Sequence, residues 1–173
     1  YKTDCSMMII KCLDEKMPLA KACVNALLRG IRLLSNNEHC GKDKMQGYGV
    51  VIYRNWCDLL REENQKDADH IECVFPHAFI HYENKLRTKQ FFERCINIIP
   101  DIDKELMNLA ISQYNDILAF AAEIVSIAHQ RDSFSKDSLK EKRNHIIEML
   151  HRSSEQEELA LSYIQKAAVK IQK

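Results

Sequence analysis

Glycine and proline are scarce in this chain. Its 173 residues include four glycines and three prolines, and residues 101–173 contain neither. Glycine gives the backbone access to positive φ angles and proline interrupts the hydrogen bonds of a helix, so a chain with few of either has little means of making tight turns. This feature predicts a few long helices joined by short connections.

Apolar residues recur at steps of three and four through most of the sequence, which is the period of one helix face. No stretch alternates apolar and polar residues as a half-buried strand would. The pattern predicts helices over residues 4–35, 50–61, 76–99, 102–131 and 138–173, with a polar helical extension over 62–72. We therefore predict an all-α, antiparallel bundle of five or six helices, some of them long. The wide apolar arc of residues 102–131 predicts that this helix lies at the centre.

Several polar residues predict where helices begin. Pro18 predicts a kink or restart near Asp14, which can act as an N-cap. Asp101 is the expected cap of the helix over 102–131. Ser138 with Glu141, and Ser154 with Glu157, have the spacing of a capping box, so the last segment is either two helices or one long one.

The chain is expected to fold as a single helical domain over residues 1–173. Residues 35–49 hold three of the four glycines and no apolar period, so they are predicted to form a mobile loop. The sequence starts at Tyr1, and the last apolar stripe runs up to the final Lys173. We expect it to be a fragment of a larger protein.

Charge and cysteine content limit the classes of function. Lys plus Arg and Asp plus Glu both number 25, so the sequence lacks the basic excess typical of nucleic-acid binding. The longest apolar stretch, Ile117–Ala128, is too short and too polar to cross a bilayer. The seven cysteines are odd in number and unpaired in spacing, which favours small buried thiols in a cytoplasmic protein over a disulfide framework.

One group of residues has the chemistry of metal ligands. Two histidines four residues apart would share a helix face, and imidazole and thiolate groups at such spacing can bind zinc. Pro76 disrupts the turn that links the two halves of the group, so a set of ordinary polar side chains is the favoured interpretation. The weak candidates are His70, Cys73, His77 and His81. No cofactor and no catalytic activity is predicted, because no catalytic or phosphate-binding motif is present.

Two basic clusters are candidates for contact with lipid or with an acidic partner, although a solvated helix face is the simpler interpretation. They consist of Lys85, Arg87 and Lys89, and of Lys136, Lys140, Lys142 and Arg143.

Aromatic residues and the last apolar stripe are candidates for partner binding. Phe91 and Phe92 point about 100° apart on a helix, so one of them could lie at an interface while the other packs in the core. The C-terminal stripe resembles the apolar face of a coiled coil or a helix that binds in a groove. Its members are Leu161, Ile164, Ala168 and Ile171.

These features favour a non-catalytic interaction or scaffold domain that binds another protein or itself. The alternative is a peripheral membrane module, since long helices with few turns resemble those of the BAR superfamily. That resemblance implies an elongated dimer with the Lys85 and Lys136 regions facing lipid, although the neutral charge departs from the usual basic face of such domains. A third possibility, a secreted helical cytokine, would require disulfides.

Overall fold

The computed structural model describes residues 18–35, 50–66, 71 and 75–171, and the structural statements below concern this part of the chain. It contains five α-helices and two short 3₁₀ helices, and no strand is present among the described residues. The elements are α1 Leu19–Ser35, α2 Val51–Gln65, α3 Phe75–Ile98, α4 Lys104–His129, η1 Arg131–Ser133, α5 Lys136–Ala168 and η2 Val169–Ile171. The predicted all-α fold is confirmed.

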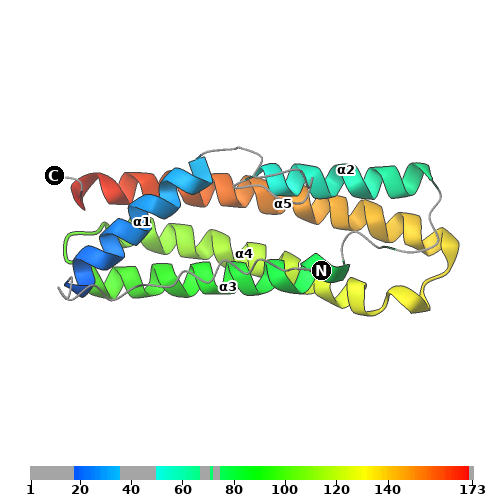
Figure 1. Ribbon diagram of the computed structural model, residues 1–173, viewed down its shortest axis with the longest axis horizontal. Helices are drawn as coiled ribbons and strands as arrows, with labels where there is room; N and C mark the ends of the chain where they lie inside the picture. Colours follow the sequence, from blue (N-terminus) through cyan, green and yellow to red (C-terminus); the bar gives the residue numbers. More distant parts are fainter. Residues whose placement is uncertain (1–17, 36–49, 67–70, 72–74, 172–173) are drawn as a thin grey trace, which may run out of the picture.

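The helices form an elongated antiparallel bundle (Figure 1). Helix α3 runs back along α4, and α4 runs back along α5, so these three helices follow one another in the bundle. Two shorter helices share the remaining side of α5. Helix α2 lies along its N-terminal half, and α1 crosses its C-terminal half obliquely (Figure 1).

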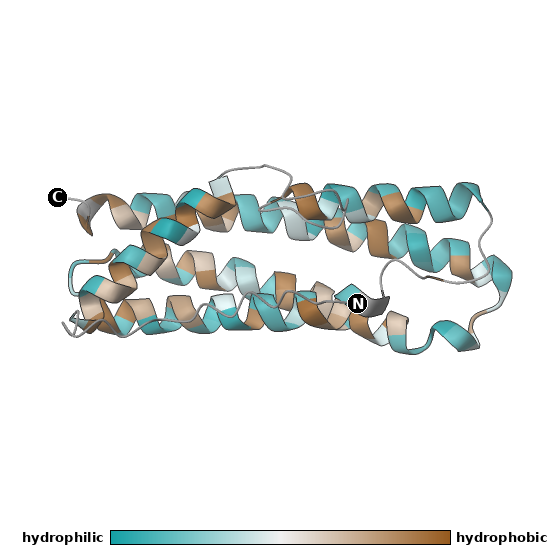
Figure 2. Ribbon diagram, viewed as in Figure 1, coloured by the Kyte–Doolittle hydropathy of each residue, from teal (hydrophilic) through white to brown (hydrophobic). Residues whose placement is uncertain are grey.

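The core consists of two clusters of buried side chains. One packs α2 and the N-terminal part of α5 against the C-terminal part of α4, around Trp56, Ile124 and Ile146. The other packs α1 and the C-terminal parts of α3 and α5 against the N-terminal part of α4, around Leu27 and Ile117. Bands of apolar and polar residues alternate along the helices in Figure 2, as expected for amphipathic helices. Helices α4 and α5 both contribute to the two clusters, and α5 packs against α4, α2 and α1, whereas α4 packs mainly against α3 and α5. The helix over 102–131 therefore shares the predicted central position with α5.

Two helices begin at caps other than the predicted ones. The carboxylate of Asp103, not that of Asp101, accepts a hydrogen bond from the Leu106 backbone N–H at 3.2 Å and caps α4. Helix α5 is capped by Ser135, whose Oγ accepts from the Ser138 backbone N–H. The predicted Ser138 cap is therefore wrong, because Ser138 lies within the first turn of α5.

The last segment is one continuous helix of 33 residues rather than two, and the possible second capping box at Ser154 lies inside it. The predicted polar extension to residue 72 is also wrong, because α2 ends at Gln65. Helix α3 ends before Pro100, as the sequence predicts. Asp14 and the expected loop beyond Ser35 lie outside the described residues.

None of the helices in the described part of the chain combines the length and the apolar character needed to cross a membrane. The thiols of Cys57 and Cys95 are buried and free, as expected from their place among apolar residues.

Candidate functional site

A cleft of about 460 Å³ lies between α1 and α3, where α1 crosses the bundle obliquely. Its α1 wall is formed by Ala26, Leu27, Gly30, Ile31, Leu33 and Leu34. The opposite wall, on α3, is formed by Asn84, Lys85, Arg87, Thr88, Phe91 and Phe92. Tyr114 from α4 and Glu157 and Ile164 from α5 complete the lining.

The sequence of α1 helps to keep this cleft open. Gly30 has no side chain, and a Cβ atom built at this position would meet nothing within 4 Å. Glycine inside a helix costs about 0.5–1 kcal/mol relative to alanine. Because a side chain at this position would meet open space, the missing side chain of Gly30 enlarges the cleft and is not required for close packing of the backbone.

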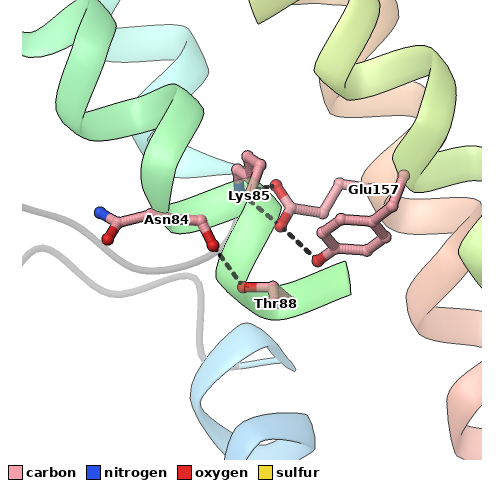
Figure 3. Close-up of polar contacts among 5 residues, drawn as sticks. Asn84, Lys85, Thr88 and Glu157 are labelled. Atoms are coloured by element: carbon pink, nitrogen blue, oxygen red, sulfur yellow. Dashed lines mark hydrogen bonds and ion pairs between the residues drawn. The ribbon is translucent and has the colours of Figure 1, made fainter. Parts of the chain in front are cut away.

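A buried ion pair lies at one end of the cleft (Figure 3). The Lys85 ammonium group on α3 donates to both carboxylate oxygens of Glu157 on α5, at 2.6 and 2.7 Å. The Tyr114 hydroxyl on α4 donates to the same carboxylate at 3.0 Å. The side chain of Glu157 is 4% exposed and that of Lys85 12%. This cluster links three helices through a carboxylate that accepts three hydrogen bonds.

Burial and neighbouring charges set the pKa values of Glu157 and Tyr114. Burial by itself raises the pKa of Glu157, but the charge and hydrogen bonds of Lys85 outweigh it and lower the pKa below its ordinary value. Burial, together with the nearby Glu157 charge, raises the pKa of Tyr114 well above the usual value for tyrosine. At neutral pH Glu157 is therefore a carboxylate and Tyr114 a neutral phenol.

Aromatic side chains from α2 pack next to this ion pair and next to His81, which lies one turn before Lys85 on α3. The Lys85 ammonium group lies 5.3 Å from the centre of the Tyr53 ring, a cation–π distance. His81 packs against the rings of Tyr53 and Trp56, with centroids 5.4 and 5.2 Å away. Burial and the Lys85 charge lower the pKa of His81 to about 3, so its imidazole is neutral at pH 7.

The predicted metal ligands are placed only in part. His77 and His81 lie one turn apart on α3, and both pack against the Trp56 ring. His70 and Cys73 lie outside the described residues. Within the described part of the chain, no group of three or more potential ligands is close enough to hold a metal ion.

The basic candidates divide into internal and external side chains. Lys85 is part of the buried ion pair, and Arg143 is 2% exposed at 3.3 Å from the Glu63 carboxylate. The expectation of a solvated or lipid-facing side chain is therefore wrong for these two residues, because each is held inside the bundle by a carboxylate.

The other basic candidates are more accessible. Arg87 is 73% exposed at the rim of the cleft, and Lys89 pairs with Glu93 at 2.8 Å. Lys142 lies over the Phe134 ring, 5.5 Å from its centre. Lys136 and Lys140 are exposed near the start of α5.

The apolar residues proposed for partner binding lie largely inside the bundle. Ile164 and Ala168 are buried, and Leu161 and Ile171 are half-buried. Phe92 is buried against Tyr114, whereas Phe91 is half-buried and lines the cleft. The C-terminal stripe is therefore a core face of α5 and η2, not a free surface, because α1 and α4 cover it.

Neither the cleft nor its polar end was predicted from the sequence. Glu157 was expected only as part of a possible capping box, whereas its carboxylate lies on the buried stripe with Ser153 and Ala160. The position of this carboxylate at a core position of an apolar stripe was the signal in the sequence that could have indicated a buried polar site. The alignment of Gly30 with a gap between α1 and α3 depends on tertiary packing and had no such signal.

Comparison of the chain with protein families, curated proteins and solved structures found no match.

Proposed function

We propose that this chain is a non-catalytic binding domain that holds a small, largely apolar molecule in the cleft between α1 and α3. The observation that carries the proposal is the cleft itself, with a volume of about 460 Å³ and walls formed mainly by aliphatic and aromatic side chains. Binding sites for small molecules commonly have 300–1,000 Å³, apolar walls and a few convergent polar groups.

The polar groups of the cleft support binding over catalysis. A general base works best with a pKa near the working pH, but the pKa of Glu157 is lowered below its ordinary value, and its carboxylate is already held by Lys85 and Tyr114. Outside the cleft lining, burial raises the pKa of the Cys57 and Cys95 thiols to about 11 and 12, which disfavours the reactive thiolate at neutral pH. These buried free thiols also support the proposed cytoplasmic location.

A protein-interaction role is a second candidate, supported by two adjacent apolar side chains. Phe79 and Ile80 on α3 are 59% and 50% exposed. If these residues form a self-association surface, Phe79→Ser should lower the solution mass measured by light scattering.

The membrane alternative has weaker support, because Lys85, which was expected to face lipid, is part of the buried ion pair with Glu157.

The test of the proposed function is an NMR titration of the ¹⁵N-labelled chain with decan-1-ol, a neutral apolar probe. We expect saturable shifts of the amide signals of residues 26–34 and 84–92. Gly30→Phe should abolish them, because its ring would fill the cleft. Gly30→Ala is the matched control, since its methyl group meets open space. Shifts that are absent, or that survive Gly30→Phe unchanged, would contradict the proposal.

A further inference from the structure

We propose that the ligand of the cleft is an amphiphilic anion, an aliphatic carboxylate whose head group binds Arg87 at the rim while its chain lies against α1. This inference rests on the proposed function, and it adds the chemical class of the ligand.

The charge of the cleft lining is the first argument. The charged side chains that line it among the described residues are Lys85, Arg87 and Glu157. Lys85 and Glu157 are 2.6 Å apart and neutralise each other. The lining therefore has a net positive charge, which comes from Arg87, and the carboxylate that pairs with Arg87 at 3.8 Å, that of Glu83, lies outside the lining. A ligand with a negative head group would complement this charge, whereas a cationic one would be opposed by it.

The availability of Arg87 is the second argument. Its guanidinium group lies 3.8 Å from the Glu83 carboxylate, with side chains that are 73% and 37% exposed, and it donates a 3.4 Å hydrogen bond to the exposed Gln90 side chain. An exposed pair of this kind contributes at most about 1 kcal/mol to stability. A ligand carboxylate can approach the guanidinium group in a bidentate arrangement, which is shorter and stronger. Arg87 can therefore exchange Glu83 for a ligand without breaking a buried contact.

The distribution of polar groups along α3 is the third argument. Asn84, Arg87 and Thr88 are spaced three and four residues apart, so they lie on one face of the helix. The next turn presents Phe91 to the cleft, and the α1 wall contributes Leu27 and further aliphatic side chains. The cleft is thus polar at one end of its α3 wall and apolar elsewhere, which matches a molecule with one polar end.

The experiment compares three ten-carbon probes by calorimetry at pH 7.5, each below its micelle concentration. They are decanoate, decan-1-ol and decyltrimethylammonium. We expect decanoate to bind about tenfold more tightly than decan-1-ol, since one charge-assisted hydrogen bond accounts for a factor of this size. The cation should bind more weakly than the alcohol. The advantage of decanoate should shrink as salt is added.

Single substitutions test whether the preference for decanoate over decan-1-ol comes from Arg87 at the rim of the cleft. Arg87→Gln should reduce decanoate binding to the level of decan-1-ol and leave decan-1-ol binding unchanged. Arg29→Gln is the matched control, because it removes the same charge from an exposed position of α1 outside the cleft lining. Glu83→Gln should tighten decanoate binding several-fold by removing the competing carboxylate. Circular dichroism of each variant checks that it is folded.

Each contrary outcome has a distinct meaning. Equal binding of decanoate and decan-1-ol, with both blocked by Gly30→Phe, would overturn the anionic head group and leave the proposed function standing. Tighter binding of the cation, or an Arg29→Gln effect equal to that of Arg87→Gln, would also overturn it. If no probe binds saturably, or Gly30→Phe changes nothing, both this inference and the proposed function fail.

Discussion

At the residue scale, the buried pair of Lys85 and Glu157 is the most consequential polar contact. Removing one partner from such a pair leaves an uncompensated charge in the protein interior, which typically costs 3–5 kcal/mol. We predict that Glu157→Gln lowers the free energy of unfolding by about 3 kcal/mol, measured by urea denaturation. The double variant Lys85→Met with Glu157→Gln should recover most of that loss, because no charge then remains buried and the Gln amide oxygen can still accept from the Tyr114 hydroxyl.

An exposed pair on the same helix provides the control. Lys89 and Glu93 are 2.8 Å apart, but the Glu93 side chain is 46% exposed. Glu93→Gln should cost less than about 1 kcal/mol. A loss for Glu157→Gln no larger than this would show that the Lys85 charge reaches solvent when its partner is removed.

Protonation of His81 gives a second prediction at this scale. Its pKa is about 3 in the folded chain and about 6.5 when unfolded, so between these values only the unfolded chain binds the proton. Stability must therefore fall as the pH falls through this window. From pH 7 to pH 5 the loss due to His81 is about 2 kcal/mol, since each pH unit within this window contributes at most about 1.4 kcal/mol.

The variant His81→Phe keeps an aromatic ring in place and removes the titrating group. Its stability should depend less on pH than that of the wild type over the same interval, by about the amount predicted. The ordinary pKa of Glu157 is 4.5, and its folded value is lower still, so this carboxylate contributes little above pH 5. Parallel stability curves for the two proteins would show that His81 is protonated without unfolding.

At the scale of single elements, the apolar residues on either side of each cap explain why the starts of two helices were predicted at the wrong residue. Ser135 is preceded by Phe134 and followed four positions later by Leu139, and both apolar residues join the same core cluster. This arrangement is a hydrophobic staple, which fixes the direction in which the chain enters a helix. The predicted cap Ser138 has Asp137 and Lys142 at the corresponding positions, where no staple can form.

The start of α4 follows the same rule. Asp103 is flanked by Ile102 and, four residues on, by Met107, which are both buried in the second cluster. Asp101 has Pro100 and Glu105 in these places and lacks that support. The helices themselves followed from periodicity, but the exact caps required reading the apolar neighbours together with the polar residue.

The cap assignment leads to a direct comparison of two serines. Ser135→Ala should lower the free energy of unfolding by about 1 kcal/mol, since the Ser138 backbone N–H loses its acceptor. Ser138→Ala removes a hydroxyl that donates to the Ser135 carbonyl at 2.8 Å, and we expect a loss of a few tenths of a kcal/mol. Thermal unfolding of both variants checks the order, and a larger loss for Ser138→Ala would contradict the assignment.

At the scale of the whole molecule, the packing of α1 could not be predicted from the sequence. Its apolar stripe predicted a buried face, but the oblique crossing buries Leu27 and leaves space that a helix aligned with α5 would fill. The cleft thus arises from an angle between helices and from Gly30, and neither is encoded in local periodicity. Phe91 and Phe92 both line the cleft, but Phe91 is half-buried whereas Phe92, one position later, is also buried in the second core cluster.

The same packing predicts that α1 opens more readily than the rest of the bundle. Among its 17 residues, all of them described, one side chain is buried, that of Leu27, whereas α4 buries eight of 26. A second cavity of about 230 Å³ adjoins Leu34 and Ser35 at its C-terminal end. Segments with few buried apolar contacts open at a lower free energy than the core. Amides of residues 23–35 should therefore exchange with deuterium faster than those of residues 108–129.

A ligand in the cleft should slow the exchange of the α1 amides, because it contacts both α1 and α3 and is lost when α1 opens. At a decanoate concentration of about 100 times the dissociation constant, binding stabilises the closed state by about 2.7 kcal/mol, so exchange of α1 amides should slow roughly a hundredfold. Gly30→Phe should show slow exchange without ligand, since its ring occupies the same space. Equal protection of α1 and α4 in the free protein would mean that α1 opens only when the whole bundle unfolds, and ligand entry would then need no motion of this helix.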